Sequence, residues 1–229
     1  MPFRIYLIRH GESMQNTEEN YVIKLPDHQV YLTEKGKEQA AEAAKFLKEY
    51  LAEKQIPLIS ARMWVSPYLR TRQTAEIVNE QLGVKDVKED VSLIEQQYGL
   101  FSDNPMEERK RLFPNEFDYY SKHFDTQGKF YAKMPLGESP LDVAMRIRHF
   151  LPTVFRDYEK GKKDTLFIVT HGVVMKAFLL DWFHLSPEWF SEEGTPTNCS
   201  IIEIVREDDG KSSHRYIYGK PRERGGSKK

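Results

Sequence analysis

The sequence predicts an α/β fold: a three-layer α/β/α sandwich with a mostly parallel central sheet. Short apolar segments alternate along the chain with longer segments whose apolar residues recur at helical spacing. Serine or threonine precedes several of the longer segments, and glycine or proline interrupts them, as expected at helix ends. The chain has 229 residues, 39% of them hydrophobic, so we expect one domain over residues 1–220 and a flexible basic tail over 221–229.

The chain opens with a predicted strand over residues 3–8, which are apolar, partly β-branched and followed by charge and glycine. Thr33 is the predicted N-cap of the first helix. The apolar face of that helix consists of Ala40, Ala43, Leu47 and Leu51.

Two further strands and a helix are predicted before residue 95. Residues 63–65 predict the second strand, and Ser66-Pro67 marks a helix start with serine as the N-cap. This helix runs to about Leu82 and stops at Gly83. Residues 91–94 predict a third short strand.

The second half of the chain continues the alternation. Residues 139–142 have the pattern of a capping box, and the helix they open has an apolar face of Val143, Ile147, Phe150, Leu151 and Val154. Residues 165–172 predict a strand that leads into a helix ending near Phe183. Residues 199–205 and 214–219 predict an antiparallel hairpin.

Composition limits the classes of function. The net charge is −1, so no basic field for nucleic acid or for an anionic membrane is expected. The single cysteine, Cys199, excludes an intrachain disulfide and a zinc site built on several cysteines. No segment resembles a transmembrane helix or a secretory signal, and we therefore expect a cytoplasmic protein.

Polar side chains follow each predicted parallel strand. Arg9 and His10 follow the first strand, and Arg70 lies one turn into the helix after the second. Glu95 follows the third strand and His171 follows the fourth. Because ligands bind at the carboxyl ends of the strands in such sheets, these side chains predict a site.

Two arginines and two histidines at one sheet edge predict a receptor for a compact anion, and phosphate fits best. The planar guanidinium groups of Arg9 and Arg70 match pairs of phosphate oxygens and stay charged. The helices that begin near Ser66 and Gly172 are expected to point backbone N–H groups at the same place.

His10 is the candidate nucleophile. A cysteine phosphatase loop needs an arginine six positions after the cysteine, and Val205 stands there relative to Cys199. A neutral imidazole can attack phosphorus, and neighbouring arginines are expected to lower its pKa. We also expect the Gly11 carbonyl to accept from His10 Nδ1 and so fix the tautomer.

A phosphate ester has a poor alkoxide leaving group, which a positioned acid must protonate. Glu95 is the best-placed carboxylate, and Glu89, Asp90 and Asp103 are the nearby alternatives. Glu12 is more consistent with a structural hydrogen bond or ion pair.

The segment that directly follows Glu95 is predicted as a helical insert over residues 101–135. Residues 105–133 predict one or two helices, broken near Pro114 and Gly128. Their aromatic residues are Phe113, Phe117, Tyr119, Tyr120, Phe124, Phe130 and Tyr131. They could form the core of a small helical subdomain or a lid, and we expect the insert to cover the active site.

Four segments together resemble the histidine phosphatase superfamily, in its phosphoglycerate mutase-like branch. They are "LIRHGES", "VSPYLRTRQTAEI", "LIEQQYG" and "IVTHG", in that order. Residues 16–36 and 101–135 do not resemble a true phosphoglycerate mutase, so the chain is more similar to the phosphatases of the branch.

The resemblance implies a role for each matching residue. It implies that His10 is phosphorylated, that Arg9 and Arg70 bind phosphate, and that His171 binds phosphate and stabilises the transition state. Glu95 matches the acid/base glutamate, and Asn16 stands where the transferred phosphoryl group is often contacted. Gly172, next to His171, is included among the expected phosphate-binding residues. The resemblance implies neither a metal nor another cofactor.

The leading hypothesis is therefore a metal-independent phosphomonoesterase that acts on a small phosphorylated molecule through phospho-His10. The nearest alternative is a mutase, which returns the phosphoryl group to a bound product. A non-catalytic phospholigand-binding protein and a metallohydrolase using His10 and His171 are two further alternatives. The metallohydrolase would also need carboxylate ligands, and the sequence shows neither degraded catalytic positions nor a clustered metal-ligand spacing.

Overall fold

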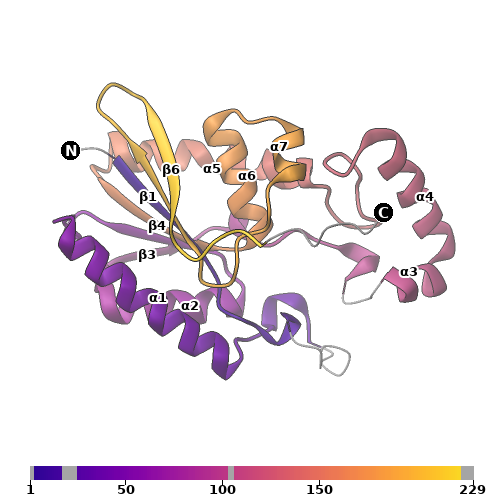
Figure 1. Ribbon diagram of the computed structural model, residues 1–229, viewed down its shortest axis with the longest axis horizontal. Coiled ribbons are helices and arrows are strands. Elements are labelled where there is room, and N and C mark those ends of the chain that lie inside the picture. The colour runs from indigo at the N-terminus through magenta and orange to yellow at the C-terminus, as the bar shows by residue number, and fades with distance from the viewer. Residues whose placement is uncertain (1–2, 17–24, 103–105, 223–229) are drawn as a thin grey trace.

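The structure is a computed structural model that describes residues 3–16, 25–102 and 106–222. A six-stranded sheet forms the centre of this part of the chain (Figure 1). Its order is β3-β2-β4-β1-β5-β6. The strands are β1 Phe3–Arg9, β2 Arg62–Val65, β3 Asp86–Glu89, β4 Thr165–Thr170, β5 Ile201–Arg206 and β6 Ser212–Tyr218. The first four are parallel, and β5 and β6 form the predicted antiparallel hairpin. The prediction of a mostly parallel sheet is confirmed.

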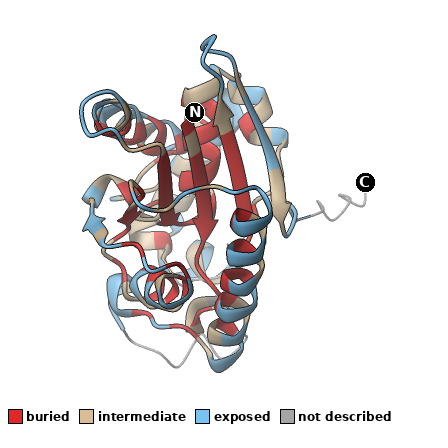
Figure 2. Ribbon diagram, turned by 90° about the vertical axis from the view of Figure 1, so that its left-hand side faces the viewer, coloured by how far each residue is buried: buried red, intermediate tan, exposed pale blue. Residues whose placement is uncertain are grey.

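Helices cover both faces of this sheet. The helices α1 Glu34–Glu53 and α2 Leu69–Leu82 pack on one face, and α5 Pro140–Glu159 and α6 Gly172–Phe183 pack on the other. Each face of the sheet has its own hydrophobic core, and strand β1 contributes to both. Tyr6 and Ile8 pack in the core under α1 and α2, and Ile5 and Leu7 pack in the core under α5 and α6. Figure 2 shows the buried strands between helices whose outer surfaces are exposed. The three-layer sandwich is therefore confirmed.

The predicted helix ends agree with the structure at three places. The Thr33 side chain accepts from the Gly36 N–H at the start of α1. Ser139 and Asp142 form a reciprocal capping box at the start of α5. Gly83 ends α2 in the left-handed region, with φ of 67°.

The prediction of a strand over residues 91–94 is wrong. Residues Val91–Leu93 form a short 3-10 helix, η4, because the Asp90 side chain accepts from the Ser92 N–H and closes a turn. The third strand is β3, Asp86–Glu89, a mostly exposed edge strand whose polar sequence carries no hydrophobic signal. Glu95 consequently lies in a loop, six positions beyond the strand end.

The insert contains helices where they are predicted. The 3-10 helix η5 Gly99–Phe101 is followed by α3 Met106–Leu112 and α4 Pro114–Gln127. Proline stands in the first turn of α4, and Gly128 with φ of 83° ends it. Figure 1 shows both helices beside the α/β sandwich and outside its two helical layers. That the insert covers the active site stays a prediction.

The aromatic residues of the insert divide between two environments. Phe130 is buried in the core beneath α5 and α6 and contacts Phe190 of the short helix α7 Pro187–Glu192. Phe101 is also buried, and its ring contacts Phe117 and Tyr120 of α4. The aromatic cluster therefore fastens α4 to η5.

The end of the described chain is paired. We assigned Pro221 and Arg222 to the tail, but Pro221 forms an antiparallel bridge with Pro196 and the Arg222 N–H donates to Thr195 O at 2.8 Å. Residues 223–229 of the predicted tail lie outside the described residues.

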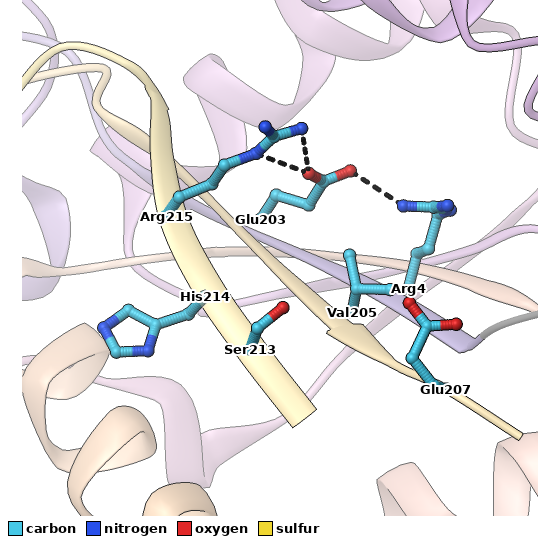
Figure 3. Close-up of a pocket in the computed structure, with 7 residues that line it drawn as sticks. All are labelled: Arg4, Glu203, Val205, Glu207, Ser213, His214 and Arg215. Carbon is cyan, nitrogen blue, oxygen red and sulfur yellow. Dashed lines mark hydrogen bonds and ion pairs between the residues drawn. The ribbon is translucent and has the colours of Figure 1, made fainter. Parts of the chain in front are cut away.

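A buried carboxylate stabilises the hairpin side of the sheet (Figure 3). Glu203 of β5 is 1% exposed and accepts hydrogen bonds from Arg4, Tyr6, Tyr50 and Arg215. The pocket drawn in Figure 3 lies next to the first residues of β1, at the sheet edge opposite the strand ends where the site is predicted. Within it, Arg4 and Arg215 both pair with Glu203, so we assign this cluster a structural role.

Replacing Glu203 with alanine is expected to lower the free energy of unfolding by about 2–3 kcal/mol, because the buried Tyr6 hydroxyl loses its acceptor. The side chains of Arg4 and Arg215 are 25% and 62% exposed, so water replaces part of the interaction that each of them loses with Glu203. Urea unfolding measures the change. The control is Glu207→Ala, an exposed carboxylate of the same pocket, expected within about 0.5 kcal/mol of wild type. A loss below 1 kcal/mol for Glu203→Ala would contradict the assignment.

Candidate active site

Four basic side chains predicted for the site converge at the carboxyl ends of the strands. Arg9 ends β1, His10 follows it, His171 follows β4, and Arg70 is the second residue of α2. Their exposed fractions are 6%, 3%, 0% and 1% in that order. The ring centroids of His10 and His171 lie 5.1 Å apart. The sheet thus brings together residues that are far apart in the sequence.

His10 is held in one tautomer. Its Nδ1 lies 2.7 Å from Gly11 O, and because a carbonyl only accepts, Nδ1 carries the proton and the lone pair is on Nε2. This contact confirms the expected role of the Gly11 carbonyl. Burial holds the pKa of His10 well below its usual value, and the charges of Arg9 and Arg70 act in the same direction. Burial is thus a larger cause than the arginines from which we predicted the shift.

Gly11 is required by a close approach of two backbones. A Cβ at this position would collide with the carbonyl of Gly36, in the first turn of α1. A Cβ on Gly36 would in turn collide with Glu12 O. Glu12 pairs with Thr33 and Lys35, as expected of a structural residue. The loop after β1 is therefore pressed onto the start of α1, which fixes the backbone of His10.

Arg9 is anchored by one end of its guanidinium. One terminal nitrogen donates to Pro196 O at 2.6 Å, whereas Nε is buried without a partner among the described residues. Burial lowers the pKa of Arg9 to about 10, and the charge of Glu95 opposes that shift. Arg9 is therefore still a cation at neutral pH.

Arg70 is anchored in a similar way. One terminal nitrogen donates to both Asp27 O and Asp27 Oδ1, each at 2.8 Å. Asp27 belongs to the short 3-10 helix η3 Asp27–Gln29, which sequence reasoning did not connect with the site. The guanidinium lies 4.9 Å from the ring centre of Tyr68, and Nε is buried without a partner in the described chain.

His171 is hydrogen-bonded to a residue whose role we predicted wrongly. Ser66 Oγ lies 2.8 Å from His171 Nε2, and Tyr68, not Ser66, is the N-cap of α2. Nδ1 of His171 is buried without a described partner. Burial, followed by the charges of Arg70 and His10, holds the pKa of His171 well below its usual value. The serine was found by sequence only as a helix signal, because its partner is 105 positions away.

Buried polar atoms without partners are concentrated here. The described residues contain five such side-chain atoms, and three of them are Arg9 Nε, Arg70 Nε and His171 Nδ1. Buried donors are normally paired, because an unpaired one costs about 1–3 kcal/mol. Two unpaired guanidinium N–H donors and an unpaired imidazole nitrogen beside His10 indicate a receptor for a compact anion.

Gly172 extends this receptor through its backbone. It is the first residue of α6, whose N-terminus contributes a positive potential at the strand ends. A Cβ at Gly172 would collide with the Thr195 side chain and would approach Arg9 Nε to 3.4 Å. Glycine therefore keeps space beside the unpaired nitrogen of Arg9.

Glu95 is a half-buried carboxylate whose charge reaches Arg9 and Arg70. Burial raises the pKa of Glu95, and the Gln96 N–H and the charges of Arg70 and Arg9 oppose the shift. The alternatives are used elsewhere, since Glu89 pairs with Arg72 and Asp90 caps η4. Asp103 lies outside the described residues.

Side chains that sequence reasoning missed hold the loop of Glu95. The Gln97 side chain donates to the Tyr68 hydroxyl at 2.6 Å, and the Gln97 N–H donates to Glu138 Oε2. Arg146 donates to Glu138 Oε1 at 2.9 Å and to Ser92 O. These partners come from the N-cap of α2, from α5 and from the segment before α5, and no local pattern in the sequence indicates them.

Asn16 is an expected phosphate-binding residue, whereas Cys199 is not expected to act as the nucleophile. Asn16 ends the 3-10 helix η1 Met14–Asn16, and its side chain lies outside the described parts of the structure. Cys199 is buried, and burial raises the pKa of its thiol to about 12, which is consistent with our rejection of Cys199 as a nucleophile.

Two other features are absent from the described residues. No described helix is both long enough and apolar enough to cross a membrane. Nor do three or more His, Cys, Asp or Glu side chains in those ranges gather into a group that could hold a metal ion.

Known proteins resemble this chain along nearly its whole length. Residues 5–218 match the histidine phosphatase superfamily (branch 1). A phosphoglycerate mutase-like protein of Arabidopsis thaliana is 32% identical over 215 residues, which cover 88% of this chain and 73% of the relative. A broad-range acid phosphatase of Saccharomyces cerevisiae is 24% identical, with 94% of this chain and 88% of the relative covered.

A solved structure supports the fold. The alpha-ribazole phosphatase of Shigella flexneri superposes with a TM-score of 0.71 at 18% identity, and the match covers 94% of this chain and 96% of that one. The match to the superfamily spans the strand-end segments that carry His10 and His171. This chain therefore belongs to branch 1 of the histidine phosphatase superfamily.

Proposed function

We propose that the protein is a phosphomonoester hydrolase that acts through a phosphohistidine on His10, with Glu95 as general acid and base. The observation that carries the proposal is the set of three unpaired buried nitrogens, Arg9 Nε, Arg70 Nε and His171 Nδ1, next to an imidazole whose Nε2 lone pair is free. Membership of the superfamily and the acid phosphatase among the relatives support the same reaction.

In the first step, His10 Nε2 attacks phosphorus as the bond from phosphorus to the alkoxide oxygen breaks. Glu95 donates its proton to that oxygen, and its raised pKa favours the protonated form that this step requires. Arg9, Arg70 and the N-terminus of α6 at Gly172 bind the phosphoryl oxygens, together with Asn16. The products are the free alcohol and phospho-His10.

In the second step, water attacks phosphorus and the bond to His10 Nε2 breaks. Glu95, now a carboxylate, takes the proton of the water, and inorganic phosphate and neutral His10 are formed. The Ser66 hydroxyl donates to His171 Nε2, so that His171 Nδ1–H donates to the phosphoryl group. No step uses a metal, so EDTA is expected to leave the rate unchanged.

The alternative is a phosphoglycerate mutase-type phosphoryl transferase. It uses the same phosphohistidine but returns the phosphoryl group to a bound product instead of water. The mutase-like name of the Arabidopsis relative is the observation that favours it.

Incubating 3-phosphoglycerate with a trace of 2,3-bisphosphoglycerate is expected to release inorganic phosphate, because Glu95 activates water in the second step. Phosphate release and 2-phosphoglycerate formation are measured in the same reaction. Formation of 2-phosphoglycerate faster than phosphate would favour the mutase and contradict hydrolysis as the main activity.

A further inference from the structure

A short two-stranded pairing lies beside the phosphate-binding groups. Residues 195–197 run antiparallel to 220–222: the Thr197 N–H donates to Lys220 O at 3.0 Å and the Arg222 N–H donates to Thr195 O at 2.8 Å. These bonds fix the backbone of Arg222 at the end of the described chain.

The same pairing touches the site at two points. Pro196 O accepts from Arg9 at 2.6 Å, and the Thr195 side chain packs against Gly172, the first residue of α6. Gly194 has no room for a Cβ, because the carbonyl of Arg222 occupies that space. Arg222 is therefore held one strand away from the segment that anchors Arg9.

The side chain of Arg222 is available to a ligand. Arg222 is exposed, and no hydrogen bond or ion pair of its guanidinium is found within the described ranges of the chain. Burial and Glu95 have the larger effects on the pKa of Arg9, but the charge of Arg222 lowers it further. Burial, Arg9 and Arg70 likewise dominate the low pKa of His10, and Arg222 acts in the same direction. Its charge thus reaches the reacting centre from the solvent side.

Arg222 is not needed for the phosphoryl group itself. Arg9, Arg70 and His171 already present three buried nitrogens to it, whereas Arg222 is exposed. An exposed cation beside the segment that anchors Arg9 suits a negative charge on the part of the substrate that leaves.

We propose that Arg222 is a specificity-determining residue that binds a second anionic group, a carboxylate or a second phosphate, on the leaving-group side of the substrate. This inference rests on the proposed function of the site. The preferred substrates are accordingly small phosphomonoesters with an additional negative charge.

The test compares substrates that differ only in that charge. 3-Phosphoglycerate and glycerol 3-phosphate are both primary alkyl phosphates, and only the first has a carboxylate. Arg222→Gln is expected to lower kcat/KM for 3-phosphoglycerate about three- to tenfold, mainly by raising KM. For glycerol 3-phosphate, kcat/KM should change by less than about twofold. Arg222→Lys should retain most of the preference, and added salt should weaken it in wild type.

A second pair of substrates identifies the anion. Fructose 1,6-bisphosphate and fructose 6-phosphate report on a second phosphate, as the first pair reports on a carboxylate. The control, Arg156→Gln, removes one exposed arginine from the far end of α5 and is expected to alter neither ratio. Equal losses for the members with and without the second anionic group, or no loss for either pair, would overturn the proposal.

Binding separates this inference from the proposed function. Dissociation constants for the same four compounds are measured on the His10→Ala protein with and without Arg222→Gln. Turnover of p-nitrophenyl phosphate by wild type tests the hydrolase separately. A preference for the doubly anionic compounds that disappears with Arg222→Gln supports the subsite even if hydrolysis fails, and an unchanged preference overturns it.

Discussion

Replacing His10 with alanine is expected to lower kcat/KM for p-nitrophenyl phosphate by about 10⁴-fold or more, because the attacking nitrogen is removed. The three unpaired nitrogens of Arg9, Arg70 and His171 remain to bind the phosphoryl group, so substrate affinity should change much less than the rate. Steady-state kinetics and a binding measurement on the same variant distinguish these two effects.

The matched control is His149→Ala, which removes an exposed histidine from α5 and is expected to keep full activity. Rapid quenching of wild type with labelled substrate should trap an acid-labile, base-stable phosphoryl group on His10. Retained turnover by a folded His10→Ala protein, or a label on another residue, would remove His10 from the nucleophile role.

Replacing Glu95 with glutamine is expected to lower kcat/KM for alkyl phosphates by about 10²–10⁴-fold, since no proton can then be given to the alkoxide. For p-nitrophenyl phosphate, whose leaving group needs little protonation, the loss in the first step should be much smaller. The test compares the loss of kcat/KM for an alkyl phosphate with the loss for p-nitrophenyl phosphate in each variant. Glu89→Gln, an exposed carboxylate paired with Arg72, is the control. Equal losses on both substrates would contradict the acid role.

The pH dependence follows from two pKa shifts. Burial raises the pKa of Glu95, and the protonated form is the acid, so alkyl phosphate turnover should fall as pH rises through that pKa. Burial lowers the pKa of His10, so the nucleophile stays neutral and the acid limb should lie below pH 6.5, the usual histidine value. In Glu95→Gln the fall at higher pH should disappear. A fall in the wild-type pH profile that is centred on pH 6.5 and persists in Glu95→Gln would contradict this assignment.

Local sequence patterns predicted most of the sandwich. Buried strands such as β1 and β4 are apolar and end abruptly in charge or glycine, and the caps at Thr33 and Ser139 use side chains only three positions from their partners. The edge strand β3 was missed because an exposed strand needs no apolar residues, and its pairing with β2 is a tertiary contact.

The sequence by itself determined which residues stand at the strand ends, because a buried strand must stop where polar residues begin. Arg9, His10 and His171 follow from that rule alone. Only the tertiary structure decided what each of them touches. The hydrogen bond from Ser66 to His171 and the contacts of Arg70 with Asp27 join residues 105 and 43 positions apart, and the pairing of Arg222 with Thr195 joins two loops. Such contacts depend on how helices and strands pack, and chain periodicity carries no signal of them.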